Sequence, residues 1–98
     1  RRNQAWAAGL AADLERAIAA GAGRDALLAC GRPYVGNLRG PLLAYHLDVE
    51  KRRVQFEPAP PGVVFRSRLH AGAPVEPRAD GFEHRVTVGR WELWVRCP

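Results

Sequence analysis

The sequence predicts a single α/β (α+β) domain in which two helices pack on a mixed β-sheet, with the element order α-β-α-β-β-β-β. Three observations support this class: an apolar residue at every fourth position near the N-terminus, a short continuous apolar run before a glycine-rich segment, and strict alternation in the second half. The 98 residues fit one core, since two halves would each be too small to be stable. Residues 1–98 are therefore expected to form one domain.

The first element is an amphipathic helix over residues 3–20. Its apolar positions, spaced four apart, form one stripe, and Gly21 follows as a glycine of the kind at which helices end. The stripe consists of Trp6, Leu10, Leu14 and Ile18.

A βαβ unit is expected next. The apolar run 26–30, introduced by Asp25, indicates a central strand buried on both faces, and the segment 31–40 has too many glycines to continue it. Pro41 suits the first turn of a second helix over residues 41–48. Alternation over 53–57 then predicts the second strand of the unit, which would be parallel to the first.

The second half predicts antiparallel strands. Residues 63–69 alternate as a strand with one wet face, and a polar loop spans 70–81. Strands over 82–88 and 91–96 are joined at Gly89-Arg90, a hairpin signal. With both helices on one face of the sheet, the opposite face would carry Arg66, Arg68, Arg85, Thr87 and one row of the last strand, and Trp94 would be more exposed than Trp91.

The segment from Gly31 to Gly40 is the first candidate ligand site, because it joins a strand end to a helix start, where free N–H groups attract anions. It matches neither the Walker A nor the GxGxxG pattern, so a loop that uses glycine only for its backbone angles is the alternative. We expect Arg32 and Arg39 to face solvent. The expected ligand-binding residues are Arg32, Tyr34, Gly36, Asn37, Arg39 and Gly40.

The charge of +5 and pI near 10.2 allow a polyanionic partner. Lys51 is the only lysine among 15 basic residues, however, so the composition also fits a GC-rich genome. A nucleic-acid-binding face, with Arg66, Arg68 and Arg85 on phosphates and Trp94 stacking on bases, is thus an alternative function, as is a small-molecule sensor using the glycine-rich loop.

The two cysteines, Cys30 and Cys97, form no CxxC pattern. We expect them to form a disulfide, which implies an oxidising compartment, with two buried thiols as the alternative. A disulfide needs Cα atoms about 4.4–6.8 Å apart, so the last strand must lie beside the first, or their ends must converge.

No metal, cofactor or catalytic residue is expected. The histidines His46, His70 and His84 show no ligand spacing, and His84 falls in the apolar register of its strand. A Cys30–His46 nucleophile and base pair has no orienting motif beside it.

Four segments, at 25–31, 40–47, 62–68 and 91–97, together resemble the soluble C-terminal domain that follows the transmembrane helices of actinobacterial membrane proteins, some similar to dolichyl-phosphate-mannose-type glycosyltransferases. The likeness runs from Leu10 onward. A start at Arg1 and the absence of methionine fit a fragment of such a longer protein.

The resemblance implies a non-catalytic domain on the extracytoplasmic side of a membrane-anchored parent. Its partners would be the membrane-spanning part of the same chain and a glycan or lipid-phosphate. The parent's catalytic residues would lie in membrane loops outside this sequence.

Overall fold

The computed structural model describes residues 2–98, and side chains from residue 4 onward. It confirms a single α+β domain with a mixed sheet and helices packed on it. The elements are α1 (Arg2–Ala20), α2 (Arg24–Ala29), β1 (Arg32–Val35), α3 (Gly40–Leu47), the 3-10 turn η1 (Lys51–Arg53), β2 (Gly62–Arg68), β3 (Val75–Glu76), β4 (Glu83–Val88) and β5 (Trp91–Arg96).

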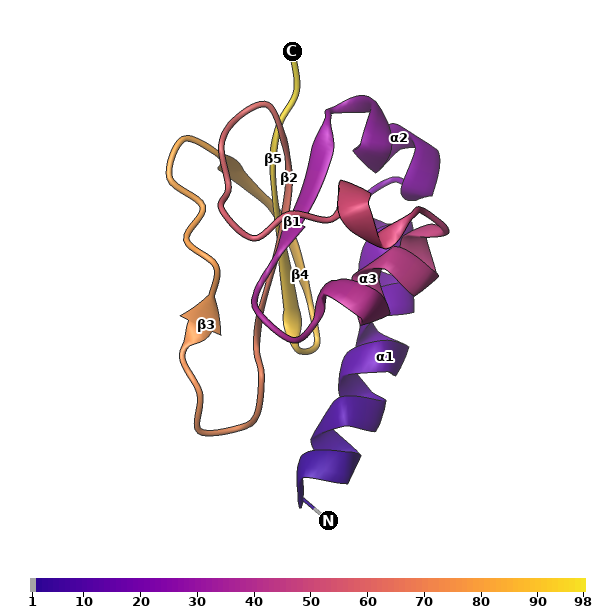
Figure 1. The fold of residues 1–98 in the computed structure, drawn as a ribbon, viewed down its shortest axis with the longest axis vertical. Helices are drawn as coiled ribbons and strands as arrows, with labels where there is room; N and C mark the ends of the chain where they lie inside the picture. Colours follow the sequence, from indigo (N-terminus) through magenta and orange to yellow (C-terminus); the bar gives the residue numbers. More distant parts are fainter. Residues whose placement is uncertain (1) are drawn as a thin grey trace.

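The main strands lie in the order β1-β2-β5-β4, with β3 paired to β2 outside this path. Strand β1 is parallel to β2, whereas β5 is antiparallel to both β2 and β4. The helices lie on one side of the sheet, and β3 with the segment around it lies on the other (Figure 1). The βαβ unit is therefore present, as β1-α3-β2.

The apolar run before the glycine-rich segment is helix α2, so the prediction of a central strand over 26–30 is wrong. Within the run, Leu27 and Cys30 are buried, while Ala26 and Ala29 are exposed. One buried face is a helical pattern, and alanine favours a helix. An apolar run this short does not distinguish a strand from a helix by its periodicity.

The first strand instead lies inside the segment that was predicted to be a loop. Strand β1 contains Pro33, which is tolerated because β1 is at the edge of the sheet. The strand expected over 53–57 is also wrong, since it reduces to η1 and one parallel bridge between Gln55 and Tyr34. That bridge covers the outer edge of β1, where Gln55 N–H donates to Pro33 O at 3.0 Å.

The main core lies between the sheet and the helices and confirms the predicted stripe of α1. Leu10, Leu14 and Ile18 are buried, and Trp6 packs at the edge. A smaller cluster of Tyr34, Val64 and Phe82 lies on the opposite face of the sheet. Strand β2 is thus buried on both faces, and the single wet face predicted for it is wrong at Val64.

Cys30 and Cys97 form a disulfide with a Cα–Cα distance of 4.2 Å, which confirms the pairing. Cys30 directly follows α2, and Cys97 directly follows β5. Strands β1 and β5 flank β2, where Arg32 and Arg96 both pair with Gly62. A side chain at Gly62 would collide with Arg32 O, so the glycine allows β1 and β2 to approach closely beside the disulfide.

Candidate functional site

In the segment from Gly31 to Gly40, which was predicted to bind a ligand, the side chain of Arg39 turns inward. Arg39 is only 2% exposed, so the prediction that it faces solvent is wrong. Its guanidinium donates to Ser67 O at 2.7 Å, to Ser67 Oγ at 3.1 Å and to Asn37 O at 3.1 Å, and it pairs with Glu76 at 3.1 Å. Arg39 therefore holds the loop against β2 and β3.

The other predicted loop residues divide into buried and exposed ones. The Tyr34 hydroxyl donates to Ala59 O at 3.0 Å, and a side chain at Gly36 would collide with the Arg39 guanidinium. Gly40, at the start of α3, lies against the ring of Phe56. Arg32 and Asn37 remain exposed, and ligand binding by this set stays a prediction.

A second polar group lies on the sheet face away from the helices, at Arg66, His84, Thr87, Glu92 and Trp94. Arg66 donates to Glu92 Oε1 at 2.8 Å and to Pro77 O at 2.7 Å. The same Oε1 accepts from Trp94 Nε1 at 2.9 Å, and the Arg66 guanidinium carbon lies 5.7 Å from the Trp94 ring centre. The carboxylate of Glu92 thus joins a cation and an aromatic ring.

A β-bulge brings His84 to this face. The register of β4 shifts between His84 and Val86, so that His84 pairs with Trp94 while Val86 pairs with Leu93. His84 is exposed, stacks edge-on against Trp94 at 5.4 Å, and lies 2.7 Å from Thr87 Oγ1. The expectation that His84 shares the apolar register is therefore wrong, whereas the prediction that Trp94 is more exposed than Trp91 is confirmed.

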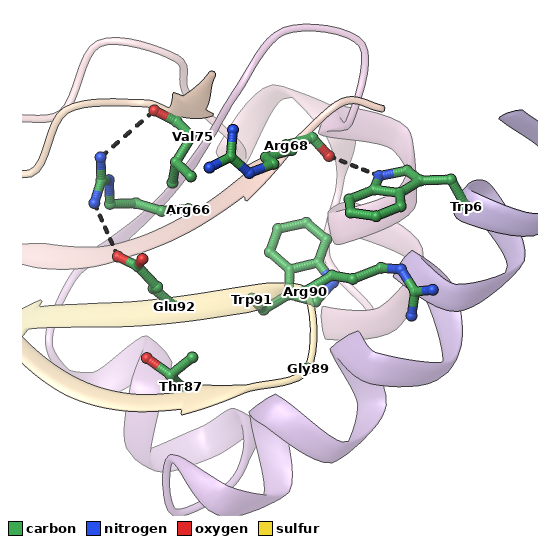
Figure 2. Close-up of a pocket in the computed structure, with 9 residues that line it drawn as sticks. All are labelled: Trp6, Arg66, Arg68, Val75, Thr87, Gly89, Arg90, Trp91 and Glu92. Carbon is green, nitrogen blue, oxygen red and sulfur yellow. Dashed lines mark hydrogen bonds and ion pairs between the residues drawn. The ribbon is translucent and has the colours of Figure 1, made fainter. Parts of the chain in front are cut away.

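A pocket of about 290 Å³ opens where this sheet face meets the N-terminal half of α1 (Figure 2). We call it the Trp6 pocket. Trp6 Nε1 donates to Arg68 O at 3.0 Å, which fixes the indole against β2. The lining residues are Trp6, Arg66, Arg68, Val75, Thr87, Gly89, Arg90, Trp91 and Glu92.

Arg90 supports the indole from the helix side. Its guanidinium carbon lies 4.8 Å from the Trp6 ring centre, a cation–π arrangement, and it pairs with Asp13 at 2.9 Å. Burial of Asp13 would raise the pKa of that carboxyl, but hydrogen bonds from Arg16 and from the backbone and side chain of Arg90 hold the pKa below its ordinary value. Asp13 is therefore a charged anchor for Arg90.

A wider pocket of about 490 Å³ lies on the other side of Arg66. Trp94 and Phe82 give it aromatic walls, and an exposed ion pair of Arg78 and Asp80, at 2.6 Å, stands at its rim. Arg66 thus separates two hollows on the same sheet face.

The sequence indicated part of this surface. The expected face carried Arg66, Arg68, Arg85 and Thr87. Arg66, Arg68 and Thr87 line the Trp6 pocket, whereas Arg85 lies at the β4 bulge outside it. Glu92 was expected only as a member of the last strand's outer row, and Val75 and Arg90 were missed. Val75 lies in the segment predicted as loop, and Arg90 was assigned only to a turn, so no local pattern marked either residue.

The chain matches no protein-family model, no curated protein and no solved structure. Within residues 2–98, no group of three or more His, Cys, Asp or Glu side chains is placed to hold a metal ion. None of the described helices has the length and apolar character needed to cross a membrane.

Proposed function

We propose that this chain is a non-catalytic extracytoplasmic domain of a membrane-anchored protein similar to dolichyl-phosphate-mannose-type glycosyltransferases. The Cys30–Cys97 disulfide carries the proposal, because disulfides persist in oxidising compartments and are rare in the cytoplasm. The resemblance described above supplies the class of parent protein. The domain would pack on the membrane-spanning part of its chain, or present a glycan or lipid-phosphate to it.

Two carboxylates at or near the Trp6 pocket are engaged in ion pairs, which supports a non-catalytic role for the domain. Asp13 is held by Arg16 and Arg90, and Glu92 is held by Arg66. In these positions the carboxylates serve as ion-pair partners that connect elements of the fold.

The nucleic-acid alternative gains less support from the same contacts. Arg66, one of its three arginines, is bound to Glu92 and to Pro77 O, which leaves Arg68 and Arg85 exposed for phosphates. Nucleic-acid binding would weaken about tenfold or more between 50 and 200 mM salt. Binding with that salt dependence would favour this alternative.

Topology reporters on the parent protein test the proposal. Alkaline phosphatase, which is active only outside the cytoplasm, and green fluorescent protein, which folds inside it, are each fused after Pro98 in the full-length chain. We expect phosphatase activity and no fluorescence, with the reverse for fusions to a cytoplasmic loop of the same parent. Fluorescence without phosphatase activity at Pro98 would contradict an extracytoplasmic domain.

A further inference from the structure

The size of the Trp6 pocket suits a small ring. Its volume of about 290 Å³ is just below the range of about 300–1,000 Å³ that is typical of sites for drug-sized ligands. Trp6 and Val75 supply apolar surface, and the Trp6 indole is held by both Arg68 O and Arg90. The pocket thus has a fixed aromatic wall and room for about one ring.

The charge of the pocket favours an anionic group. Three arginines line it, but Arg66 is paired with Glu92, and Arg90 with Asp13. Arg68 forms no ion pair within residues 2–98, and its guanidinium donates to Ala73 O. A guanidinium has five N–H donors in a planar fork that matches a carboxylate or a phosphate, so Arg68 has donors left for such a group.

The pocket also holds acceptors that a bare anion would not satisfy. Glu92 uses Oε1 for both Arg66 and Trp94, and its Oε2 accepts no hydrogen bond from the described part of the chain. Thr87 lies opposite Glu92 in the β4–β5 register and adds a hydroxyl, which contacts His84 Nε2 at 2.7 Å and keeps a lone pair for a ligand. A free carboxylate oxygen repels an anion but accepts hydrogen bonds from hydroxyl groups. A ligand that used both Arg68 and Glu92 would therefore carry an anionic group and hydroxyl donors.

We infer that the Trp6 pocket binds a single anionic sugar unit, with its carboxylate or phosphate on Arg68, its hydroxyls on Glu92 and Thr87, and its ring against Trp6. This inference adds a class of ligand to the proposed function. It rests on that proposal only for its biological setting, because the pocket itself is formed by this chain alone.

The test is an NMR titration of the 98-residue chain with D-glucuronate and with glucose 1-phosphate, alongside D-glucose, acetate and inorganic phosphate. We expect at least one of the two sugar anions to shift the Trp6 indole signal and the amides of 87–92, with a Kd about tenfold below those of the three simpler compounds. A response to glucuronate alone identifies a uronate site, and a response to glucose 1-phosphate alone identifies a sugar-phosphate site.

Matched arginine variants locate the effect. Arg68→Gln is expected to weaken binding about tenfold, whereas Arg85→Gln removes the same charge from an exposed site outside the pocket and should leave the Kd unchanged. Arg68→Lys keeps the charge without the planar fork and is expected to lose part of the affinity. This variant replaces Arg68→Gln in the test if Arg68→Gln does not fold.

Four results would overturn the inference. They are no shift with either sugar anion, acetate or phosphate binding as tightly as the sugar anions, equal losses in the Arg68 and Arg85 variants, and tighter binding of a short single-stranded oligonucleotide at the same signals. Any of these results would leave the topology experiment unaffected, and a cytoplasmic location would leave this titration unaffected, so the two failures can be told apart.

Discussion

Asp13 Oδ2 accepts two hydrogen bonds from Arg90, one from the backbone N–H and one from the guanidinium, each at 2.9 Å. The contact joins α1 to the turn between β4 and β5. Gly89 in that turn has φ +54, and a side chain there would collide with the Asp13 carboxylate. The packing of α1 on the sheet therefore depends on a glycine and a charged pair as well as on apolar burial.

Asp13→Asn should lower the free energy of unfolding by about 2 kcal/mol, because the buried negative charge that strengthens the hydrogen bonds from Arg16 and Arg90 is lost. Urea denaturation measures the change. Asp25→Asn is the matched control, since the Asp25 side chain is 92% exposed and, among the described side chains, pairs only with its neighbour Arg24. That control should change stability by less than about 0.5 kcal/mol. Equal losses in both variants would contradict a special role for Asp13.

The pH dependence of stability should show the same contact. The folded-state pKa of Asp13 lies below its ordinary value, so its stabilising effect is complete above the unfolded pKa of about 3.9 and is lost as pH falls through the folded pKa. The stability difference between the wild type and Asp13→Asn should therefore shrink as the pH is lowered from about 5 toward 2. A difference that stays constant over this range would argue against a charged Asp13 in the fold.

Arg39→Ala and Arg32→Ala should differ sharply although both residues flank the same loop. Arg39 is buried, and its loss should cost about 3 kcal/mol because it leaves the buried Ser67 oxygens unpaired and removes the packing of a long side chain, whereas the 48% exposed Glu76 side chain can be solvated. Arg32 is exposed, so its replacement should cost less than about 0.5 kcal/mol. Thermal and urea unfolding of the two variants provide the comparison. Similar stabilities would show that the Arg39 contacts contribute little.

These two arginines also differ in a property that the sequence does not predict, the burial of the side chain. Both lie in a glycine-containing segment, and nothing nearby distinguishes them. Arg39 is buried because Ser67 and Glu76, which lie 28 and 37 residues further along the chain, offer acceptors. Burial of a polar side chain is set by such distant partners, whereas the α1 stripe and the β4–β5 hairpin follow from local periodicity and were predicted.

The wrong strand over 26–30, the missed strand β1 and the misplaced histidine have related causes. The run 26–30 is too short for its periodicity to separate a strand from a helix, and the strand β1 contains a proline that only an edge position tolerates. His84 changes face because of a bulge, which shifts a period-two pattern by one residue. The Trp6 pocket combines such features, so its assembly could not be read from the sequence.

Removal of the disulfide by Cys30→Ser together with Cys97→Ser should lower stability by about 4 kcal/mol, the chain-entropy value for cysteines 67 residues apart. Urea denaturation of the double variant, compared with oxidised and reduced wild type, measures this loss. Reduced wild type should match the variant. A double variant as stable as the oxidised protein would show that the bridge does not stabilise the fold.

The most direct test of an extracytoplasmic, disulfide-bonded domain is the thiol state of the protein in its own cells. Cells are quenched in acid, and the denatured protein is alkylated before and after reduction and then analysed by mass spectrometry. The disulfide seen between Cys30 and Cys97 predicts no alkylation before reduction and two alkylated thiols after it. Two alkylated thiols before reduction would contradict both the bridge and the oxidising compartment.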